Sequence, residues 1–546
     1  MPAKRSLTLA LALLLVAAIP AQASGFPTLT IADDIQPGTG SASPLWTAGR
    51  LGDYLYTQAD DGVTGSELWR TNGTTSTQVA NINPNGTDSS YPWGFTALGD
   101  YLYFQADDGT HGAELWRTDG TTTELVQDIN TNGADGSSLN YLTALGGYLY
   151  FSANDGMHGA ELWRTDGTTT TLVQDINTNG ATFDSSDPSY LTAYGSYIYF
   201  QANDGVNGHE LWRTNGTTTT LVSDINTGNS GVDSSSPYGF TALGGYLYFS
   251  AIDGTHGEEL WRTNGTTTTL VSDINTGNSG VDSSSPYGFT ALGDYLYFQA
   301  DDGTHGYELW RTNGTTTALV MDINTNNSGA EGSYPSAFTA LGGYLYFSAD
   351  DGTHGYELWR TNGTTTERVA DINAGSPDSY PWDFEAFGNW LYFRAADGTT
   401  GQELWRTNGT STTRVADINT TGTDGSYPYA LTALGGYVYF NATVGVTTKL
   451  WRVSAEGAVE PSSPTGTDVF FGCMCDRPIL TLDGRLFAQM YTAESGFEFI
   501  YFDEPTYGLP LTNRDGSAWS TALVLLAALT AIAGVGLRLR KGSLAK

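Results

Sequence analysis

The sequence predicts an all-β protein built from about ten repeated four-stranded units, on three observations. The motif Glu-Leu-Trp-Arg-Thr, followed by Asp or Asn and then Gly-Thr, occurs eight times, and its tryptophans recur every 46 to 49 residues between Trp69 and Trp405. Short runs of aromatic and β-branched residues, which favour strands, fill each period without any helical periodicity. Turn signals rich in Gly and Asn separate these runs. Each repeat is therefore interpreted as one structural unit.

The sixth unit illustrates the expected strands. They are Phe289–Leu292, Tyr295–Ala300, Glu308–Thr312 and Thr315–Ile323, and a loop rich in Gly, Asn and Ser follows. The Asn-Gly pair between the third and fourth strands is a strong hairpin signal. Four strands in about 48 residues match one blade of a β-propeller. A parallel β-helix is the main rival, but its coils are shorter and need no hairpin in every repeat.

The number of units predicts how the chain closes. Units begin near Leu45, Trp93, Tyr141, Tyr190, Tyr238, Tyr287, Ser336, Trp382 and Tyr429, and a divergent tenth begins at Pro478. The tenth unit has no fourth strand of its own, whereas Thr28–Ile35 resembles the fourth strand Arg368–Ile372. We therefore expect one ring closed by the N-terminal strand, which removes two exposed sheet edges. Two five-bladed rings are the alternative. The segment from Ala455 to Arg477 is unrelated to the repeat.

The repeated motif resembles the ELWxxDGT-repeat family of secreted microbial surface proteins, over residues 44 to about 456. Glu114–Thr121 and Glu161–Thr168 fit the pattern fully, and the other six copies carry Asn in place of Asp. Asn keeps the left-handed backbone tolerance that a turn needs, so the expected fold is the same. The resemblance implies a surface module with a propeller-like fold and no defined activity.

Both ends of the chain predict export and anchoring. The basic and then apolar N-terminus is typical of a signal peptide cleaved between Ala23 and Ser24. The uncharged run Ala518–Leu537 is long enough to span a bilayer, and the basic residues after it predict a cytoplasmic tail. Leu509–Asn513 resembles the LPxTG sorting signal of wall-attached proteins, although Asn513 replaces its glycine. The expected divisions are a signal peptide (1–23), a propeller (24–505, with strand 28–35 completing the last blade), a linker (506–517), a transmembrane helix (518–537) and a tail (538–546).

The charge balance excludes one class of partner. The chain has 23 Lys and Arg against 58 Asp and Glu, which gives a formal net charge of −35. Such a surface repels the phosphate backbone, so we expect no nucleic-acid partner.

The histidines and aspartates of the repeats have two possible roles, metal binding and turn formation. All six histidines lie in or beside the Asp-Gly turns of separate units, five at one register and His209 two positions on, so they are expected to line turns and not to share a metal. The Asp pairs lack the alternating spacing of a calcium loop, and Asp before Gly is ordinary turn chemistry. The acidic loops are the better calcium candidates, through Asp224, Asp233, Asp273 and Asp282.

The aromatic residues divide into two groups. The motif tryptophans occupy one strand register and are expected to pack between blades. Trp46, Trp93, Trp382 and Trp390 fall outside that register and are the candidate exposed aromatics for ligand binding.

The only cysteines, Cys473 and Cys475, are separated by a single residue, which allows either a strained disulfide or two thiols. The sequence shows no nucleophile motif, so no catalytic residue is assigned. We therefore expect a membrane-anchored extracellular propeller that binds a glycan or protein ligand on the cell surface. A carbohydrate-active enzyme on the same scaffold and a structural surface-layer component are the alternatives.

Overall fold

The computed structural model describes residues 29–31, 35–36, 42, 48–73, 75–178, 184–227, 233–277, 282–325, 331–420, 424–461, 480–482, 485–492 and 496–503. The expected signal peptide, linker, sorting motif, anchor and tail lie outside these residues, as do Trp46, Cys473 and Cys475. Within the described part every regular element is a strand, and no helix there is long and apolar enough to cross a membrane.

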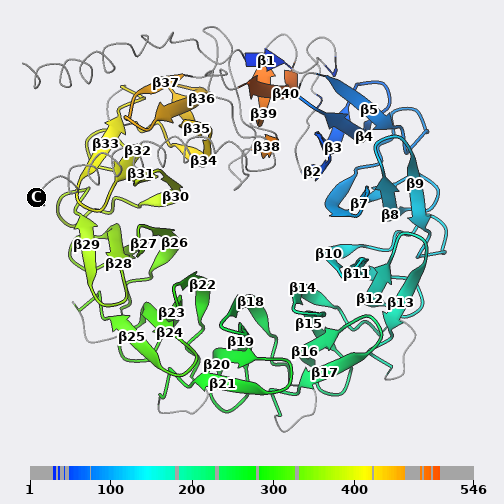
Figure 1. The fold of residues 1–546 in the computed structure, drawn as a ribbon, viewed down its shortest axis with the longest axis horizontal. Helices are drawn as coiled ribbons and strands as arrows, with labels where there is room; N and C mark the ends of the chain where they lie inside the picture. The colour runs from blue at the N-terminus through cyan, green and yellow to red at the C-terminus, as the bar shows by residue number, and fades with distance from the viewer. Residues whose placement is uncertain are drawn as a thin grey trace, which may run out of the picture. The chain divides into compact units, whose positions relative to one another are not determined.

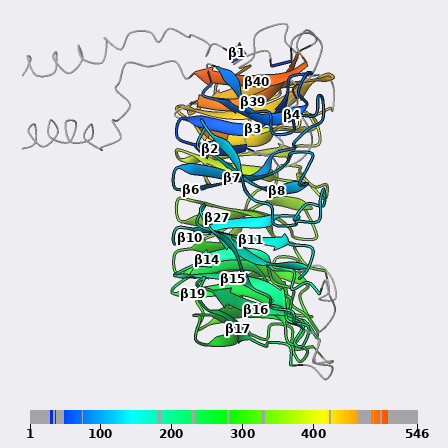
Figure 2. The same ribbon diagram turned by 90° about the vertical axis from the view of Figure 1, so that its right-hand side faces the viewer.

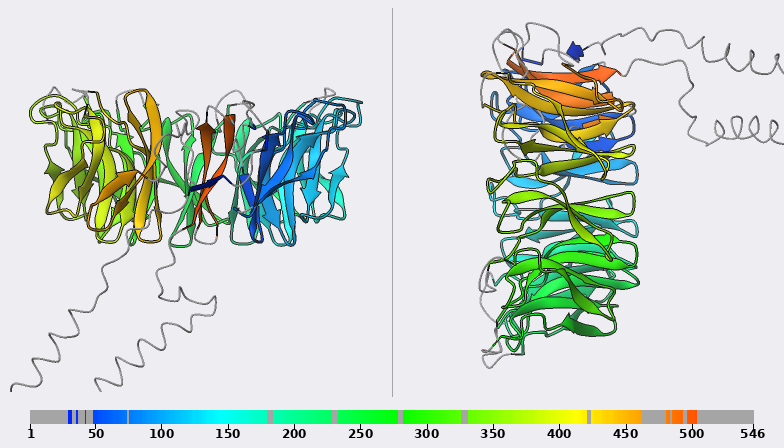
Figure 3. Two further views of the ribbon diagram at one scale, coloured as in Figure 1. Left: turned by 90° about the horizontal axis from the view of Figure 1, so that it is seen from above. Right: turned by 90° about the vertical axis from the view of Figure 1, so that its left-hand side faces the viewer.

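The strands form ten four-stranded antiparallel sheets within one compact unit, Thr28–Asp503. Nine of the sheets each use four consecutive strands, from β2–β5 to β34–β37. Each of these sheets contacts the next through its first strand, so β2 meets β6, β6 meets β10, and so on to β34. Figure 1 shows the nine sheets succeeding one another with their first strands on the inner side, and Figures 2 and 3 show them side by side. This is a propeller-like repeat fold.

The first strands carry a bulge near their start. From β6 onward, the pairing with the second strand shifts register two or three residues into the strand, as between Asn140 and Thr143. The first strands are β2 Ala48–Leu51, β6 Trp93–Leu98, β10 Asn140–Leu145, β14 Ser189–Tyr194, β18 Tyr238–Leu243, β22 Tyr287–Leu292, β26 Ser336–Leu341, β30 Trp382–Phe387 and β34 Tyr429–Leu434.

The second strands form the centre of each sheet. Three to five consecutive residues of each are buried, because both faces of the sheet are covered by neighbouring sheets. They are β3 Tyr54–Asp60, β7 Tyr101–Asp107, β11 Tyr148–Asn154, β15 Tyr197–Asn203, β19 Tyr246–Ile252, β23 Tyr295–Asp301, β27 Tyr344–Asp350, β31 Trp390–Ala396 and β35 Tyr437–Val444.

The third strands carry the Glu-Leu-Trp-Arg-Thr motif. They are β4 Ser66–Thr71, β8 Ala113–Thr118, β12 Ala160–Thr165, β16 His209–Thr214, β20 Glu258–Thr263, β24 Tyr307–Thr312, β28 Tyr356–Thr361, β32 Gln402–Thr407 and β36 Thr447–Ser454. The outer, fourth strands are β5 Ser76–Ala80, β9 Thr123–Gln127, β13 Thr170–Gln174, β17 Thr219–Ser223, β21 Thr268–Ser272, β25 Thr317–Met321, β29 Thr366–Ala370, β33 Thr412–Ala416 and β37 Val459–Pro461.

The hairpin between the third and fourth strands differs from the two-residue turn that Asn-Gly predicts. Thr312 pairs with Thr317, so four residues form the loop, and the fourth strand begins two residues later than expected. The Asn313 side-chain oxygen accepts the backbone N–H groups of Thr315 and Thr316, each at 2.9 Å. The left-handed residue is Gly314, with φ of 81°. Asp and Asn are therefore interchangeable because both supply this oxygen, which corrects the explanation based on backbone tolerance.

The tenth sheet joins the two ends of the described chain. Its strands are β38 Leu480–Leu482, β39 Arg485–Thr492, β40 Gly496–Asp503 and β1 Leu29–Ile31, in the order β1-β40-β39-β38. Leu29 pairs with Phe502 and Ile31 with Ile500, so β1 takes the place of a fourth strand, as the sequence predicts. One expectation is wrong: β37 pairs with β36, so the segment beginning at Ala455 contributes the fourth strand of the ninth sheet.

The core lies between successive sheets. One cluster joins Tyr56, Leu68 and Ile82 of the first sheet to Leu102 and Phe104 of the second. The equivalent residues form a cluster at each of the seven following interfaces. The motif tryptophan of each later sheet packs against the same cluster, so the predicted place of these residues between sheets is confirmed.

Candidate functional site

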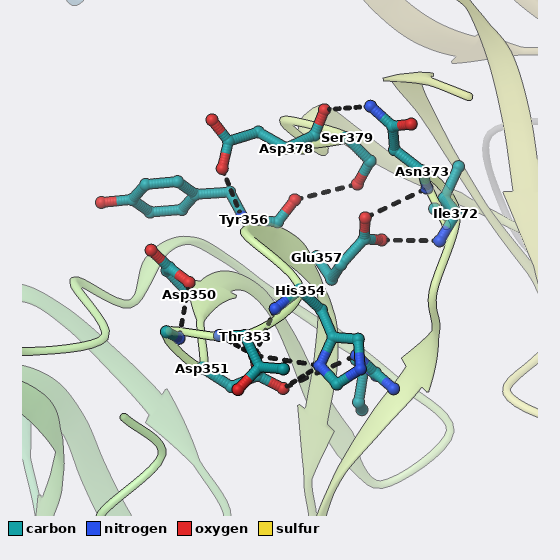
Figure 4. Close-up of polar contacts among 12 residues, drawn as sticks. Asp350, Asp351, Thr353, His354, Tyr356, Glu357, Ile372, Asn373, Asp378 and Ser379 are labelled. Carbon is teal, nitrogen blue, oxygen red and sulfur yellow. Dashed lines mark hydrogen bonds and ion pairs between the residues drawn. The ribbon is translucent and has the colours of Figure 1, made fainter. Parts of the chain in front are cut away.

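The motif glutamate is a structural residue in each sheet that carries it. Figure 4 shows Glu357, whose carboxylate accepts the backbone N–H groups of Ile372 at 2.8 Å and Asn373 at 3.1 Å. Its side chain is fully buried, and burial raises its pKa to about 7 although these hydrogen bonds oppose the rise. The carboxylate thus fixes the backbone where the fourth strand leads toward the next sheet.

The histidines line the Asp-Gly turns, as the sequence predicts. In Figure 4, Asp351 Oδ1 accepts the His354 backbone N–H at 2.8 Å, and Asp351 Oδ2 lies 2.8 Å from His354 Nδ1. His111, His158, His256 and His305 repeat this pairing with an aspartate three residues earlier. The sixth, His209, lies at the start of β16 opposite Asn203. Across the described residues, no group of three or more His, Cys, Asp and Glu side chains is placed to hold a metal ion.

The calcium candidates occupy two successive units. Asp224 and Asp273 each bury one carboxylate oxygen, Oδ1, that has no hydrogen-bond partner among the described residues. Burial, with a smaller effect of nearby Asp204, raises the pKa of Asp224. Asp282 lies against the backbone of Gly277, and Asp233 is at the equivalent place one unit earlier. The structure therefore does not gather the four residues into one site.

The predicted exposed aromatics have different surroundings. Trp93 and Trp382 begin the first strands β6 and β30, and they are 40% and 43% exposed. Trp390 is half-buried, because it begins the second strand β31 and the guanidinium of Arg406 lies 4.2 Å above its ring. Tyrosine holds this position in the other sheets, where the motif arginine stacks in the same way, as Arg70 does on Tyr54. Trp390 is thus part of the scaffold.

The sequence did not predict a concave surface that lies on the first strands of five successive sheets. It has a volume of about 620 Å³ and is lined by residues of the first strands β10, β14, β18, β22 and β26. We call this surface the inner wall. Its prominent side chains are Tyr141, Tyr190, Tyr238 and Tyr287, and all its other lining residues are Leu, Thr, Gly, Phe or Ala. No charged side chain belongs to this lining, although the chain as a whole is strongly acidic.

The tyrosines form a row across neighbouring sheets. The rings of Tyr141 and Tyr190 are 6.0 Å apart between centroids, and those of Tyr190 and Tyr238 are 6.4 Å apart. Tyr141, Tyr190 and Tyr287 are 46%, 47% and 63% exposed, whereas Tyr238 is half-buried. Exposed rings at such spacing, each from a different sheet, make a surface on which flat apolar groups can stack.

The bulge places these rings by two different routes. In β18 and β22 the tyrosine comes first and a glycine with φ near +72° follows it, as in Tyr238-Gly239. In β10 and β14 the tyrosine itself occupies the left-handed position, with φ of 59° at Tyr141 and 56° at Tyr190. A bulky side chain with such a φ is a strained arrangement.

Threonine side chains support the strained bulges. Thr143 Oγ1 donates to the carbonyl of Tyr141 at 2.9 Å, and Thr192 Oγ1 donates to that of Tyr190 at 2.9 Å. The corresponding bond is 3.3 Å for Thr241, where glycine occupies the bulge, and also for Thr432, where Ala430 does. The Thr143 hydroxyl also lies 3.3 Å from the carbonyl oxygen of Leu191 in the next sheet.

A sequence signal for the row exists. The two residues that precede Phe-Thr-Ala, Leu-Thr-Ala or, in β30, Phe-Glu-Ala hold one aromatic residue in seven of the eight units from β6 to β34, at either of the two positions. The signal was missed because the aromatic changes position, so no fixed register reveals it.

No protein-family model and no curated protein matches this chain. Similar solved structures include a prolyl endopeptidase, at 12% identity and a TM-score of 0.33, covering 60% of this chain and 49% of that one. A Mycobacterium tuberculosis puromycin-hydrolysing peptidase matches at 11% identity and a TM-score of 0.29, covering 64% of this chain and 57% of that one. A xyloglucanase from Xanthomonas campestris matches at 14% identity and a TM-score of 0.28, covering 83% of this chain and 90% of that one. This chain therefore spans about half the length of the first structure, and TM-scores this low assign it no activity.

Proposed function

We propose that this protein is a binding module, displayed on the extracellular face of the cell membrane, whose ligand contacts the inner wall. The observation that supports this most is the row of four tyrosines, three of them exposed, along a concave surface of about 620 Å³. Exposed aromatic patches on an otherwise polar protein mark interaction sites, and concave sites of this size hold ligands. The histidine turns and buried glutamates are already engaged by the scaffold.

A glycan is the preferred ligand class. Sugars present flat apolar faces that stack on aromatic rings, and their hydroxyl groups suit the threonine side chains and backbone groups beside the rings. A protein ligand, as the second class, would be held by the same apolar contacts. The proposed location on the cell surface, through residues 1–23 and 518–537, comes from the sequence and fits a ligand outside the cell.

Ring closure belongs to the same proposal. The pairing of β1 with β40 brings both ends of the described chain into one sheet, and the other nine sheets contact one another in unbroken succession. Both observations favour a single ring of ten blades over two rings of five. A closed ring would hold the inner wall at a fixed curvature, which preorganises the tyrosine row for its ligand.

The test is a glycan array probed with the full-length chain, together with a screen for degradation of the polysaccharides that bind. The proposal predicts binding to a limited set of glycans without their cleavage. Cleavage would favour the alternative of a carbohydrate-active enzyme. Binding to no glycan, with a protein ligand recovered at the inner wall by cross-linking, would overturn the choice of ligand class.

A further inference from the structure

We propose that Tyr141, Tyr190, Tyr238 and Tyr287 form one continuous track for a single neutral polysaccharide chain. The inference rests on the proposed binding function and names its ligand. It starts from the fact that every sheet from β10 to β22 places one tyrosine on the same wall, whichever bulge position supplies it.

The fold requires no tyrosine at the bulge position that Tyr141 and Tyr190 occupy. Glycine occupies the position of Tyr190 in three units, at Gly94, Gly239 and Gly288, so the fold itself needs no side chain there. A tyrosine with φ of 56° costs stability that glycine would not cost. Ala337, Asp383 and Ala430 hold the same backbone in other units, so the strain by itself marks no ligand contact. In β10 and β14 the residue at this position supplies an aromatic ring to sheets whose preceding residue, Asn140 or Ser189, is not aromatic.

The geometry argues for one extended chain. Ring separations of 6.0 Å and 6.4 Å are similar, so the rings offer a regular series of contacts across three sheets, and Tyr287 extends it to a fourth. A polymer with a regular repeat can engage several rings at once, whereas a monosaccharide engages one. The contacts within one chain then reinforce each other, so affinity should rise with the number of sugar units.

The charges argue for a neutral polymer. The inner wall has no cationic side chain to pair with carboxylate or sulfate groups, and the chain carries a net charge of −35. An anionic polysaccharide would therefore be repelled over long range and would find no ion pair at the wall. A neutral chain meets neither penalty.

The first experiment compares ligands. Affinity electrophoresis of the full-length chain is run in gels containing a neutral glucan, mannan or xylan, or an anionic polygalacturonate, and oligosaccharides of one to six units are titrated for the polymer that binds. We expect retardation by a neutral polymer only, and an affinity that rises at least tenfold from one unit to six. Equal retardation by polygalacturonate, or an affinity independent of length, would overturn the proposal.

The second experiment uses Tyr190→Gly, Tyr190→Phe and the matched control Tyr91→Gly. Tyr91 is also exposed and left-handed, with φ of 47°, but it is not part of the wall. Both glycine variants should melt no lower than the wild type, because each relieves strain. Only Tyr190→Gly should bind the polymer about tenfold more weakly, and Tyr190→Phe should retain binding because it keeps the ring.

These outcomes separate the two proposals. If the wild type binds no polysaccharide, the proposed glycan-binding function fails. If it binds one and Tyr190→Gly binds equally well, the track is wrong while the function stands. A melting temperature of Tyr190→Gly several degrees below that of the wild type would show that the ring serves the fold, and would also overturn the track.

Discussion

Arg70 in one sheet donates a hydrogen bond from Nη1 to the carbonyl of Gly120 in the next, at 2.7 Å. The same guanidinium lies 4.4 Å above the ring of Tyr54 in its own sheet. A side chain on Gly120 would meet both Arg70 and Tyr56, so the two parts of the repeated motif complement each other across sheets. The arginine of each copy up to Arg360 packs in this way against the turn glycine of the following copy, which explains why they recur together.

This arrangement predicts that turn glycines are sensitive to substitution for a reason beyond backbone conformation. Gly314 has φ of 81°, and a methyl group there would lie 2.2 Å from Arg262 Nη1 and 2.3 Å from the Tyr248 hydroxyl. Gly293 also has a positive φ, of 61°, but nothing lies within 4 Å of its Cβ position. Gly293→Ala should cost about 1 kcal/mol, and Gly314→Ala about 2 kcal/mol or more. Chemical denaturation of the two variants measures the difference, and equal losses would disprove the inter-sheet contact.

The repeat architecture was predictable from the sequence because equivalent residues make the same packing contacts in each unit, so the motif recurs at a fixed period. The motif tryptophan, the turn histidines and the pairing of the N-terminal strand, seen at Leu29–Ile31, with the last unit followed from periodicity and residue type. The role of Glu357 did not, because its partners lie 15 and 16 residues away in a segment of irregular backbone. The tyrosine row was also not predicted, because the bulge that makes Tyr141 and Tyr238 equivalent is a backbone feature that residue spacing alone does not show.

The buried glutamates predict a stability that falls as pH rises. Burial raises the pKa of Glu161, Glu210, Glu259, Glu308 and Glu357 from 4.5 to about 7. Between these values the folded chain holds protons that the unfolded chain has released, so the stabilisation present below pH 4.5 is lost as pH rises toward 7. The raised pKa of His111, His158, His256 and His305 acts in the same direction above pH 6.5. The melting temperature should therefore be higher at pH 5 than at pH 8.

The control for this titration is Glu308→Gln, which keeps the shape and removes the ionisable group. It should destabilise the fold at acidic pH by about 1–3 kcal/mol, because the amide nitrogen cannot accept a hydrogen bond from Ile323 or Ser333, whereas either oxygen of the protonated carboxyl can. Its melting temperature should also vary less with pH. A wild type that becomes more stable from pH 5 to pH 8 would show that the converging donors, and not burial, govern the glutamate pKa.

Calcium binding is predicted to be weak and selective. The buried oxygens of Asp224 and Asp273, which have no partner among the described residues, and the acidic loops offer hard ligands without the spacing of a high-affinity site. Calcium at a hundredfold excess over a dissociation constant would stabilise the fold by about 2.7 kcal/mol. Melting curves of the full-length chain in calcium, magnesium and sodium chloride at equal ionic strength test this. Superimposable curves would show that the three salts act only by general screening of the negative charge, without specific calcium binding.

Removal of the N-terminal strand should weaken the tenth sheet. Without residues 28–35 the backbone of β40 loses its partner β1 and becomes an exposed edge. The variant should melt at a lower temperature and aggregate more readily than a control lacking residues 24–27, which precede β1. Identical melting curves for the two deletions would contradict closure through this strand.

Hydroxyl-radical footprinting with a bound polysaccharide tests the central claim, that the ligand lies on the inner wall, most directly. The tyrosine side chains are labelled in the full-length chain with and without the polymer, and modification of each residue is measured by mass spectrometry. Tyr141, Tyr190 and Tyr287 should become protected, whereas the exposed Tyr91 and Tyr427 should be modified equally in both samples. Protection of Tyr91 and Tyr427 with unchanged modification of Tyr190 would place the ligand elsewhere and contradict the account.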